Sequence, residues 1–185
     1  MAAAGACMLA PAAQAAPAET GGTPAVSPPA EVGAAPALAG SASRARSVNG
    51  VAVAPAGAPA PVVAAIAAAN RLVGKPYRYG GGHRSFEDRG YDCSGAVSYA
   101  LRGAGVLRAP LDSSSFMRWG ARGQGRWITV YTNPGHAYVV IAGLRFDTSL
   151  GDRVTARVTV GPRTGPKWGA PRSPRGFVAR HPVGL

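Results

Sequence analysis

Cysteine is scarce in this sequence, which contains only Cys7 and Cys93. A scaffold built on several disulfides, common in small exported domains, is therefore excluded. Cys93 stands in the stretch YDCSGAVSYAL, between a polar loop and an amphipathic segment. A structural cysteine is expected inside an apolar run, so this boundary position indicates a chemical role for the thiol.

Aromatic residues are absent before Tyr77 and after Phe177. The chain before Tyr77 is rich in Pro, Ala and Gly, as in TPAVSPPAEVGAAPALAG. Such a segment buries too little apolar surface to offset the entropy that it loses on ordering. Residues 16–61 are therefore predicted to form a linker or disordered arm, and residues 62–185 a single domain of ordinary size.

Long hydrophobic runs are also lacking. The apolar run near the N-terminus is short and is broken by Pro11, so no stable membrane insertion is expected. Ala13 and Ala15 are small residues at the spacing of a cleavage site before Ala16, and residues 1–15 are interpreted as a signal-peptide remnant. The alternatives are a plain alanine-rich segment and a lipid-modified Cys7. Loss of residues 1–15 leaves Cys93 as the single thiol of an exported chain, which favours a reactive cysteine.

Acidic residues are few, so the formal net charge is +12, carried almost entirely by arginine. Positive charge suits a polyanionic partner such as an anionic cell-wall polymer. A GC-rich genome produces the same composition without any such partner. Nucleic acid is not expected, because the arginines are scattered and no nucleic-acid-binding motif accompanies them.

Sequence patterns in residues 62–185 predict helices first and strands afterwards. Apolar residues at helical spacing predict a helix over 62–73 and a second one from Ser94 to Gly103, with Asp92 as its N-cap. A short helix is expected in LDSSSFMRWG, and strands in RWITVYT, HAYVVIAG, LRFDTS and FVARHPV, whereas GPRTGPKWGAPRSPRG is typical of a loop. This order of elements predicts an α+β fold.

Cys93 is expected at the start of the second helix, where unpaired N–H groups and the helix dipole favour the thiolate. Asp92 opposes ionisation, so the thiolate needs a cationic partner, and histidine is the usual one. His136 follows Pro-Gly at the head of an apolar strand, whereas His83 lies in a glycine-rich loop and His181 precedes a proline. The histidines lack the spacing of a metal site, so neither a metal nor another cofactor is expected.

Three segments together resemble a known family. VGKPYRYGGG, YDCSGAVSYALRGAGV and PGHAYVVIAGLRFDTS are similar to the NlpC-type cysteine peptidases of bacterial cell walls. That family has an aromatic-rich loop, then Asp-Cys-Ser-Gly opening a helix, then a Gly-His strand and a strand with a third polar residue. The resemblance covers roughly residues 62–150. It implies a papain-like α+β domain with the nucleophile helix packed on an antiparallel sheet.

The resemblance also implies the roles of individual residues. Cys93 would be the nucleophile, His136 the general base and Asp147 the third residue, in place of the histidine that is common in the family. The implied reaction is hydrolysis of stem-peptide bonds in peptidoglycan, commonly between D-γ-glutamate and the diamino acid. The backbone N–H of Cys93 would contribute to an oxyanion hole. The substrate-binding candidates are Tyr77, Tyr79, Asp92, Ser94 and Ser114.

Strand geometry alone does not favour Asp147 as the partner of His136. If Gly143 and Leu144 form a tight turn, Asp147 lies opposite Val140, about 13 Å along the strand from His136. That separation is too long for a hydrogen bond unless a bulge or a longer turn shifts the register. The alternative is that Asp147 is a rim residue and that a backbone carbonyl orients His136.

Two other functions remain open. Another acyl-transfer enzyme on the same scaffold would use a similar Cys–His pair, although the tyrosine-rich loop and the lack of an amphipathic membrane helix count against it. A non-catalytic wall-binding module would not need both Cys93 and His136. The sequence therefore predicts a bacterial cysteine endopeptidase, secreted or wall-associated and monomeric, whose partners are peptidoglycan stem peptides and anionic wall polymers.

Overall fold

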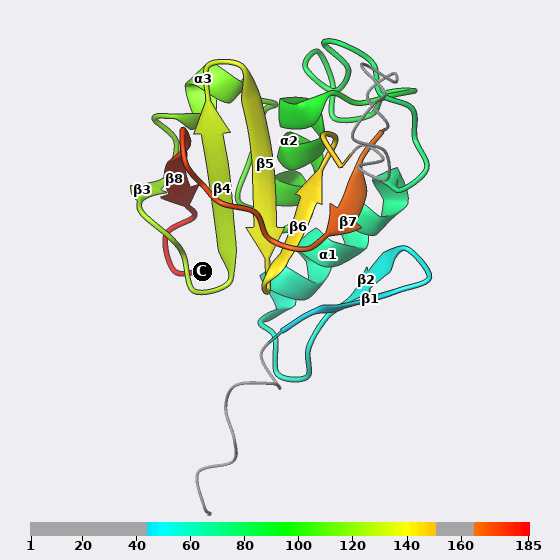
Figure 1. The fold of residues 1–185 in the computed structure, drawn as a ribbon, viewed down its shortest axis with the longest axis vertical. Helices are drawn as coiled ribbons and strands as arrows, with labels where there is room; N and C mark the ends of the chain where they lie inside the picture. The colour runs from blue at the N-terminus through cyan, green and yellow to red at the C-terminus, as the bar shows by residue number, and fades with distance from the viewer. Residues whose placement is uncertain (1–43, 151–164) are drawn as a thin grey trace, which may run out of the picture. The chain divides into compact units, whose positions relative to one another are not determined.

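The computed structural model of the chain describes residues 44–150 and 165–185, whose elements are shown in Figure 1. No helix in these two stretches is long and apolar enough to cross a membrane. The helices are α1 (Ala60–Leu72), α2 (Cys93–Gly103) and α3 (Ser113–Phe116). The strands are β1 (Arg46–Val48), β2 (Val51–Val53), β3 (Ala121–Arg122), β4 (Ile128–Asn133), β5 (His136–Ile141), β6 (Leu144–Asp147), β7 (Lys167–Gly169) and β8 (Val178–His181).

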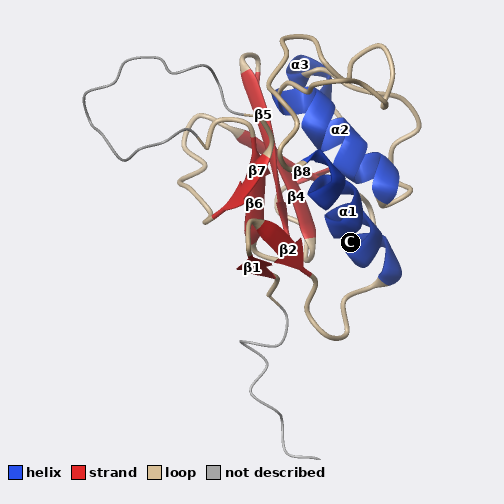
Figure 2. Cartoon of the chain, turned by 90° about the vertical axis from the view of Figure 1, so that its right-hand side faces the viewer, coloured by secondary structure: helices blue, strands red, loops and turns tan. Residues whose placement is uncertain are grey.

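Six of the strands form one antiparallel sheet in the order β3-β8-β4-β5-β6-β7. Helices α1 and α2 pack against each other, and α2 packs against the central strand β5. Figure 2 shows both helices on the same face of the sheet. The predicted α+β class is therefore confirmed, with the helix that carries Cys93 packed on an antiparallel sheet.

Strand β5 explains how this sheet both builds the core and carries polar groups. Ala137, Val139 and Ile141 are fully buried and belong to the hydrophobic core. Alternate residues of a strand point to opposite faces, so His136 and Tyr138 lie on the other face of the sheet. Because every second residue of β5 is buried in the core, the residues between them are the ones whose side chains remain available for chemistry.

Helix α2 begins at Cys93 because Asp92 caps it. The backbone of Asp92 is extended, with φ −89° and ψ −172°, and its side chain accepts a hydrogen bond from the N–H of Gly95. At the other end, Gly103 lies against α1, where an added Cβ would collide with Ala68. The missing side chain lets the two helices approach closely, which fixes the direction of α2 and the place of its first residue.

Residues 44–61 are described by the structure as part of the folded domain, so the prediction that the disordered arm extends to residue 61 is wrong. Strands β1 and β2 form a hairpin whose turn is Asn49-Gly50, both with positive φ. This dipeptide is favoured at type I′ turns, which require positive φ at both positions. The hairpin is held on α1 by two hydrogen bonds between the Asn70 amide and the backbone of Ala52, at 2.9 and 2.8 Å. The rest of the predicted arm and the predicted signal segment lie outside the described residues.

Strand β7 lies in a segment that the sequence pattern identified as a loop. Trp168 pairs with Phe146 of β6, and their rings lie 4.9 Å apart. The indole N–H of Trp168 donates to Asn70 Oδ1 at 2.8 Å. Only three residues long, β7 is too short to show a periodic pattern, and its position depends on these tertiary contacts.

Candidate active site

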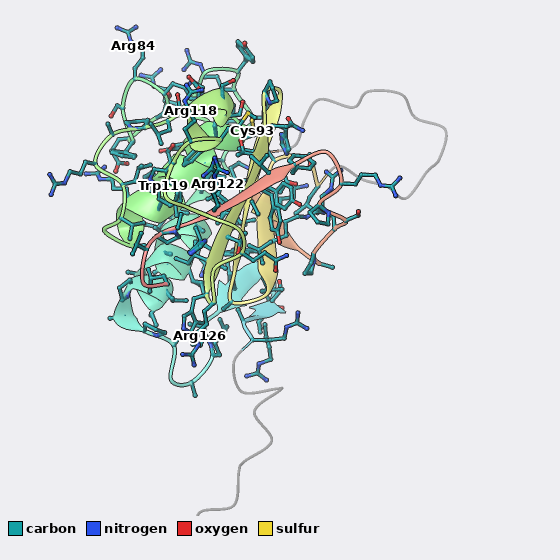
Figure 3. All side chains as sticks on the ribbon, turned by 90° about the vertical axis from the view of Figure 1, so that its left-hand side faces the viewer. Arg84, Cys93, Arg118, Trp119, Arg122 and Arg126 are labelled. Carbon is teal, nitrogen blue, oxygen red and sulfur yellow. The ribbon has the colours of Figure 1, made fainter. Side chains whose placement is uncertain are left out.

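Cys93 is the first residue of α2 and lines a cavity of about 290 Å³. Cys93 is only 7% exposed. The sulfur is therefore enclosed by protein on most sides. Figure 3 shows Cys93 close to the upper end of the sheet. All the predicted substrate-binding residues line the same cavity: Tyr77, Tyr79, Asp92, Ser94 and Ser114.

His136 is positioned by the tight turn between β4 and β5. Asn133 pairs with His136 across this turn, and the Asn133 side chain accepts a hydrogen bond from the N–H of Gly135 at 3.0 Å. Ser113 of α3 donates to the carbonyl of Pro134 at 3.1 Å, which ties the turn to the cavity wall. His136 is the first residue of β5, and its imidazole is within hydrogen-bonding reach of the Cys93 thiol.

Asp147 accepts a hydrogen bond from His136 Nε2 at 2.8 Å. The β5–β6 turn consists of Ala142 and Gly143, with φ of 46° and 82°. Val139 pairs with Phe146, and the next step of the same register places Asp147 opposite Tyr138. A turn at Gly143 and Leu144, as considered from the sequence, would have placed Asp147 opposite Val140. The observed partner of Asp147 is two residues nearer to His136. Opposite and diagonal neighbours share a face, so the observed register allows the contact without a bulge.

Asp147 is held in place by further hydrogen bonds. Ser149 donates its backbone N–H to Oδ1 at 2.8 Å and its hydroxyl to Oδ2 at 2.7 Å. Arg145 lies 3.6 Å from Oδ2. Burial alone would raise the pKa of the Asp147 carboxyl, but the hydrogen bond and charge of His136, together with Ser149, outweigh it and lower the pKa. Asp147 is therefore an ionised, immobile acceptor for the imidazole.

His136 is stabilised in its protonated form. Burial opposes protonation, but the hydrogen bonds to Asp147 and Cys93 and their negative charges outweigh it. Together they raise the pKa of His136 to about 9. Since Nε2 is bound to Asp147, Nδ1 is the ring nitrogen that remains for the thiol.

The thiol of Cys93 is correspondingly acidic. Burial raises its pKa and Asp92 raises it further, but the hydrogen bond and charge of His136 and the N–H of Ala137 lower it more. The net shift is downward from the ordinary value. A lowered pKa for the thiol and a raised pKa for the imidazole both favour transfer of the proton from Cys93 to His136, which gives a thiolate–imidazolium pair.

Asp92 is the centre of a second hydrogen-bond network beside the thiol. Its Oδ1 accepts from Gly95 N at 2.8 Å, and its Oδ2 accepts from Gly80 N at 3.1 Å. Its side chain is only 6% exposed. Asp92 therefore joins the glycine-rich loop to the start of α2, and its oxygens are already well supplied with donors.

His83 and Asp112 also line the cavity, although the sequence did not single them out as site residues. His83 Nε2 lies 3.0 Å from Asp92 Oδ1 and 2.9 Å from Ser94 Oγ. Asp112 caps α3 by accepting from Ser115 N at 2.7 Å and is exposed to solvent. The signal for Asp112 was its place before three serines, as an N-cap residue. The signal for His83 was its glycine-rich loop, which precedes the nucleophile.

The third histidine, His181, lies outside the cavity. His181 lies in β8, where its Nδ1 is 3.1 Å from the carbonyl oxygen of Gly123, away from the cavity. Within residues 44–150 and 165–185, no group of His, Cys, Asp or Glu has the arrangement of a metal site. The chemistry that the described site supports is therefore that of an activated thiol with a histidine acid–base partner.

The chain resembles two solved structures at low sequence identity. No family model matches it, and neither does any curated protein. It is similar to the peptidoglycan hydrolase RipB from Mycobacterium tuberculosis, with 21% identity and a TM-score of 0.49, over 65% of this chain and 64% of that chain. It is also similar to a mutated form of RipA, a resuscitation-promoting-factor-interacting protein, with 20% identity and a TM-score of 0.46, over 75% of this chain and 71% of that chain. The chain thus spans slightly less than two thirds of the RipB chain, and the reaction class follows from the side chains of the site rather than from these likenesses.

Proposed function

We propose that this protein is an exported cysteine endopeptidase that cleaves the stem peptides of peptidoglycan. The observation that carries the reaction class is the hydrogen bond from His136 to Asp147, with the acidic thiol of Cys93 on the other side of the imidazole. A nucleophile, a base and a group that orients the base form the minimal set for thiol-based acyl transfer. The substrate class comes from the NlpC-type sequence segments that carry these three residues.

The proposed reaction has two steps. The Cys93 thiolate attacks the carbonyl carbon of the scissile amide, and the negative charge that develops on oxygen is stabilised by first-turn N–H groups of α2, including that of Cys93. His136 transfers its proton to the departing amine, which leaves a thioester on Cys93. Water then attacks the thioester, His136 accepts its proton, and the released acid regenerates the free thiolate–imidazolium pair.

Asp147 holds His136 in the protonation and orientation that both steps need. Its hydrogen bond to Nε2 fixes Nδ1 toward the sulfur, and its charge stabilises the imidazolium that exists before the amine departs. Because Ser149 and Arg145 restrain the carboxylate, the imidazole needs little reorganisation during the reaction.

The cavity beside Cys93 is suited to the acyl part of a small peptide. Its volume of about 290 Å³ is at the lower end of the range for ligand pockets. Tyr79, which is 90% exposed, offers a free aromatic face, and Ser114 and Asp112 offer polar groups on the opposite segment. We assign the scissile bond to the link between D-γ-glutamate and the diamino acid, with Asp92 on the acyl side.

The test is mass spectrometry of peptidoglycan digested with the full chain and, in parallel, with Cys93→Ala. The proposal expects wild-type protein to release stem fragments with a new amino terminus on the diamino acid, and the variant to release none. An acyl-transfer enzyme would instead yield products joined to an added amine or alcohol acceptor. A wall-binding module would yield no fragments. Either result contradicts the proposal.

A further inference from the structure

One side of the molecule carries arginines without neutralising carboxylates. We call this set the basic face; its members are Arg118, Arg122, Arg126 and Arg180. In Figure 3, Arg118, Arg122 and Arg126 follow one another down this side, with Cys93 toward its upper end. These three side chains are exposed, whereas Arg180 is half-buried in strand β8.

The basic face forms no ion pair with a carboxylate of the described residues, although Asp112, the N-cap of α3, stands in the same segment as Arg118. Each ion pair between an arginine and a carboxylate in these residues is formed outside the basic face, as in Arg78–Asp88, Arg102–Glu87 and Arg145–Asp147. No member of the basic face comes within ion-pair distance of a carboxylate in residues 44–150 or 165–185. The positive charge of this side is therefore left for solvent or for a ligand.

The strand register places two of these charges together. Arg122 of β3 is directly opposite Arg180 of β8. Directly opposite residues in antiparallel strands project to the same face, with Cβ atoms about 5 Å apart, and like charges there are destabilising. Arginine-rich composition explains why such residues are frequent, but it does not explain why two stand opposite each other without a counter-charge. A bound anion would remove this repulsion.

The segment that carries the basic face is firmly held. Phe116 is fully buried, and its ring meets that of Trp119 edge to face at 5.7 Å. Arg126 lies over the ring of Trp127 at 5.7 Å. Binding therefore requires little ordering of the chain between these aromatic anchors, which lowers its entropic cost.

The basic face adjoins the substrate cavity. Ser113 and Ser114 of α3 line the cavity, and the N–H of Arg118 donates to the carbonyl of Ser115 at 3.1 Å. One turn of chain thus separates the cavity wall from the first arginine. A polymer that lies along the basic face would hold the chain beside the material that enters the cavity.

We propose that the basic face binds a phosphodiester-linked polymer of the cell wall. The choice of a wall polymer rests on the proposed function, which places the domain at peptidoglycan. The choice of phosphate rests on chemistry, because a guanidinium group matches phosphate oxygens in a bidentate manner and a phosphodiester stays ionised at all physiological pH values. Several arginines in succession suit a chain of repeated anions better than a single small ion.

The test compares two triple variants of the full chain that lose the same charge. The first carries Arg118→Gln, Arg122→Gln and Arg126→Gln. The second carries the same replacement by glutamine at Arg84, Arg89 and Arg108, which are exposed and do not belong to the basic face. Binding to fluorescent poly(glycerol phosphate) is measured at a series of salt concentrations. We expect the first triple variant to bind at least about tenfold more weakly and to lower the slope of log K against log salt by about 2. We expect the second to change binding by less than about threefold.

Equal losses in the two triple variants would show that only total charge matters and would overturn the proposal, as would full binding by the first variant. Binding to single-stranded DNA with the same number of phosphates that is tenfold tighter than to the polymer would also overturn it, in favour of nucleic acid. Cleavage of a soluble stem peptide by the same proteins reports on the proposed function separately. Failure of that cleavage with intact polymer binding would disprove the peptidase and leave the polymer-binding surface established.

A single substitution tests the repulsion that motivates the proposal. Arg122→Gln removes one of the two opposed charges, so we expect a higher Tm than wild type at low salt and a smaller difference at high salt. Saturating poly(glycerol phosphate) should raise the Tm of wild type more than that of the variant. A lower Tm for Arg122→Gln without polymer would contradict the account.

Discussion

His136 Nε2 and Asp147 Oδ1 lie 2.8 Å apart on neighbouring strands, one step diagonal to each other in the register. Their contact depends on a turn whose two residues, Ala142 and Gly143, both have positive φ. This turn type suits the right-handed twist of a two-residue hairpin. A turn one residue later would carry Asp147 away from His136, so the position of the turn determines whether the imidazole has a carboxylate partner.

Substitution of Asp147 should reduce catalysis without preventing folding. Asp147→Asn keeps the size of the side chain but loses its charge, and Asp147→Ala loses the acceptor altogether. We expect kcat/KM on a stem peptide to fall by about 10- to 10⁴-fold, as in other enzymes of this type. Unchanged kcat/KM in both variants, with normal melting curves, would leave Cys93 and His136 as a dyad.

The thiolate–imidazolium pair predicts a bell-shaped pH profile. On the acidic limb of the profile, activity should rise with pH as Cys93 ionises, and the midpoint of this rise should lie below the ordinary thiol pKa of about 8.5. At high pH it should fall near 9, where His136 loses the proton that the departing amine needs. Alkylation of Cys93 by iodoacetamide measures the thiol directly, without a substrate. His136→Ala should move the alkylation midpoint upward, and an unmoved midpoint would show that His136 does not stabilise the thiolate.

Loss of the Asp92 cap should cost more stability than loss of the Asp112 cap. Asp92→Ala leaves the N–H groups of Gly80 and Gly95 without their acceptor in a buried network. We expect the free energy of unfolding to fall by roughly 2–3 kcal/mol. The matched variant Asp112→Ala removes a solvent-exposed cap from a four-residue helix and should cost about 1 kcal/mol or less. Denaturant unfolding of the two variants gives the comparison, and equal costs would contradict the buried role of Asp92.

The β1–β2 hairpin should contribute to stability, unlike a disordered arm. A chain that begins at Arg44 keeps the two hydrogen bonds between the Asn70 side chain and the Ala52 backbone, and the one from Ala45 N to Ala142 O. A chain that begins at Val62 loses them, and its free energy of unfolding should be lower by roughly 2–4 kcal/mol. Equal stability of the two truncated chains would show that the hairpin adds nothing.

The sequence predicted the N-cap of α2 correctly and its first residue to within one position, because the start of this helix is determined locally. Asp92 has the side chain of an N-cap residue, and an apolar stripe at helical spacing follows it from Val97. The same local chemistry brought Cys93 to the helix N-terminus. His136 was also recognisable, because the Pro-Gly turn of the β4–β5 hairpin directly precedes it.

Features that depend on tertiary contacts were predicted less well. The turn before β6 was placed one residue late, because Ala142 is an unusual residue for positive φ and gives no sequence signal. The Asn49-Gly50 dipeptide did carry a hairpin signal, but the alanine- and proline-rich composition around it favoured a disordered arm. That hairpin is stable because Asn70 of α1 binds its backbone, a contact that no local pattern reveals.

The central claim is that Cys93 is the nucleophile of a stem-peptide hydrolase. It is tested most directly by kcat/KM of the full chain and of Cys93→Ala on a synthetic stem peptide that contains the D-γ-glutamyl–diamino acid bond. The account predicts cleavage of that bond by the wild type and a loss of at least about 10⁴-fold in the variant, with an unchanged melting curve. Cleavage by a folded Cys93→Ala protein at a rate near that of the wild type would contradict it.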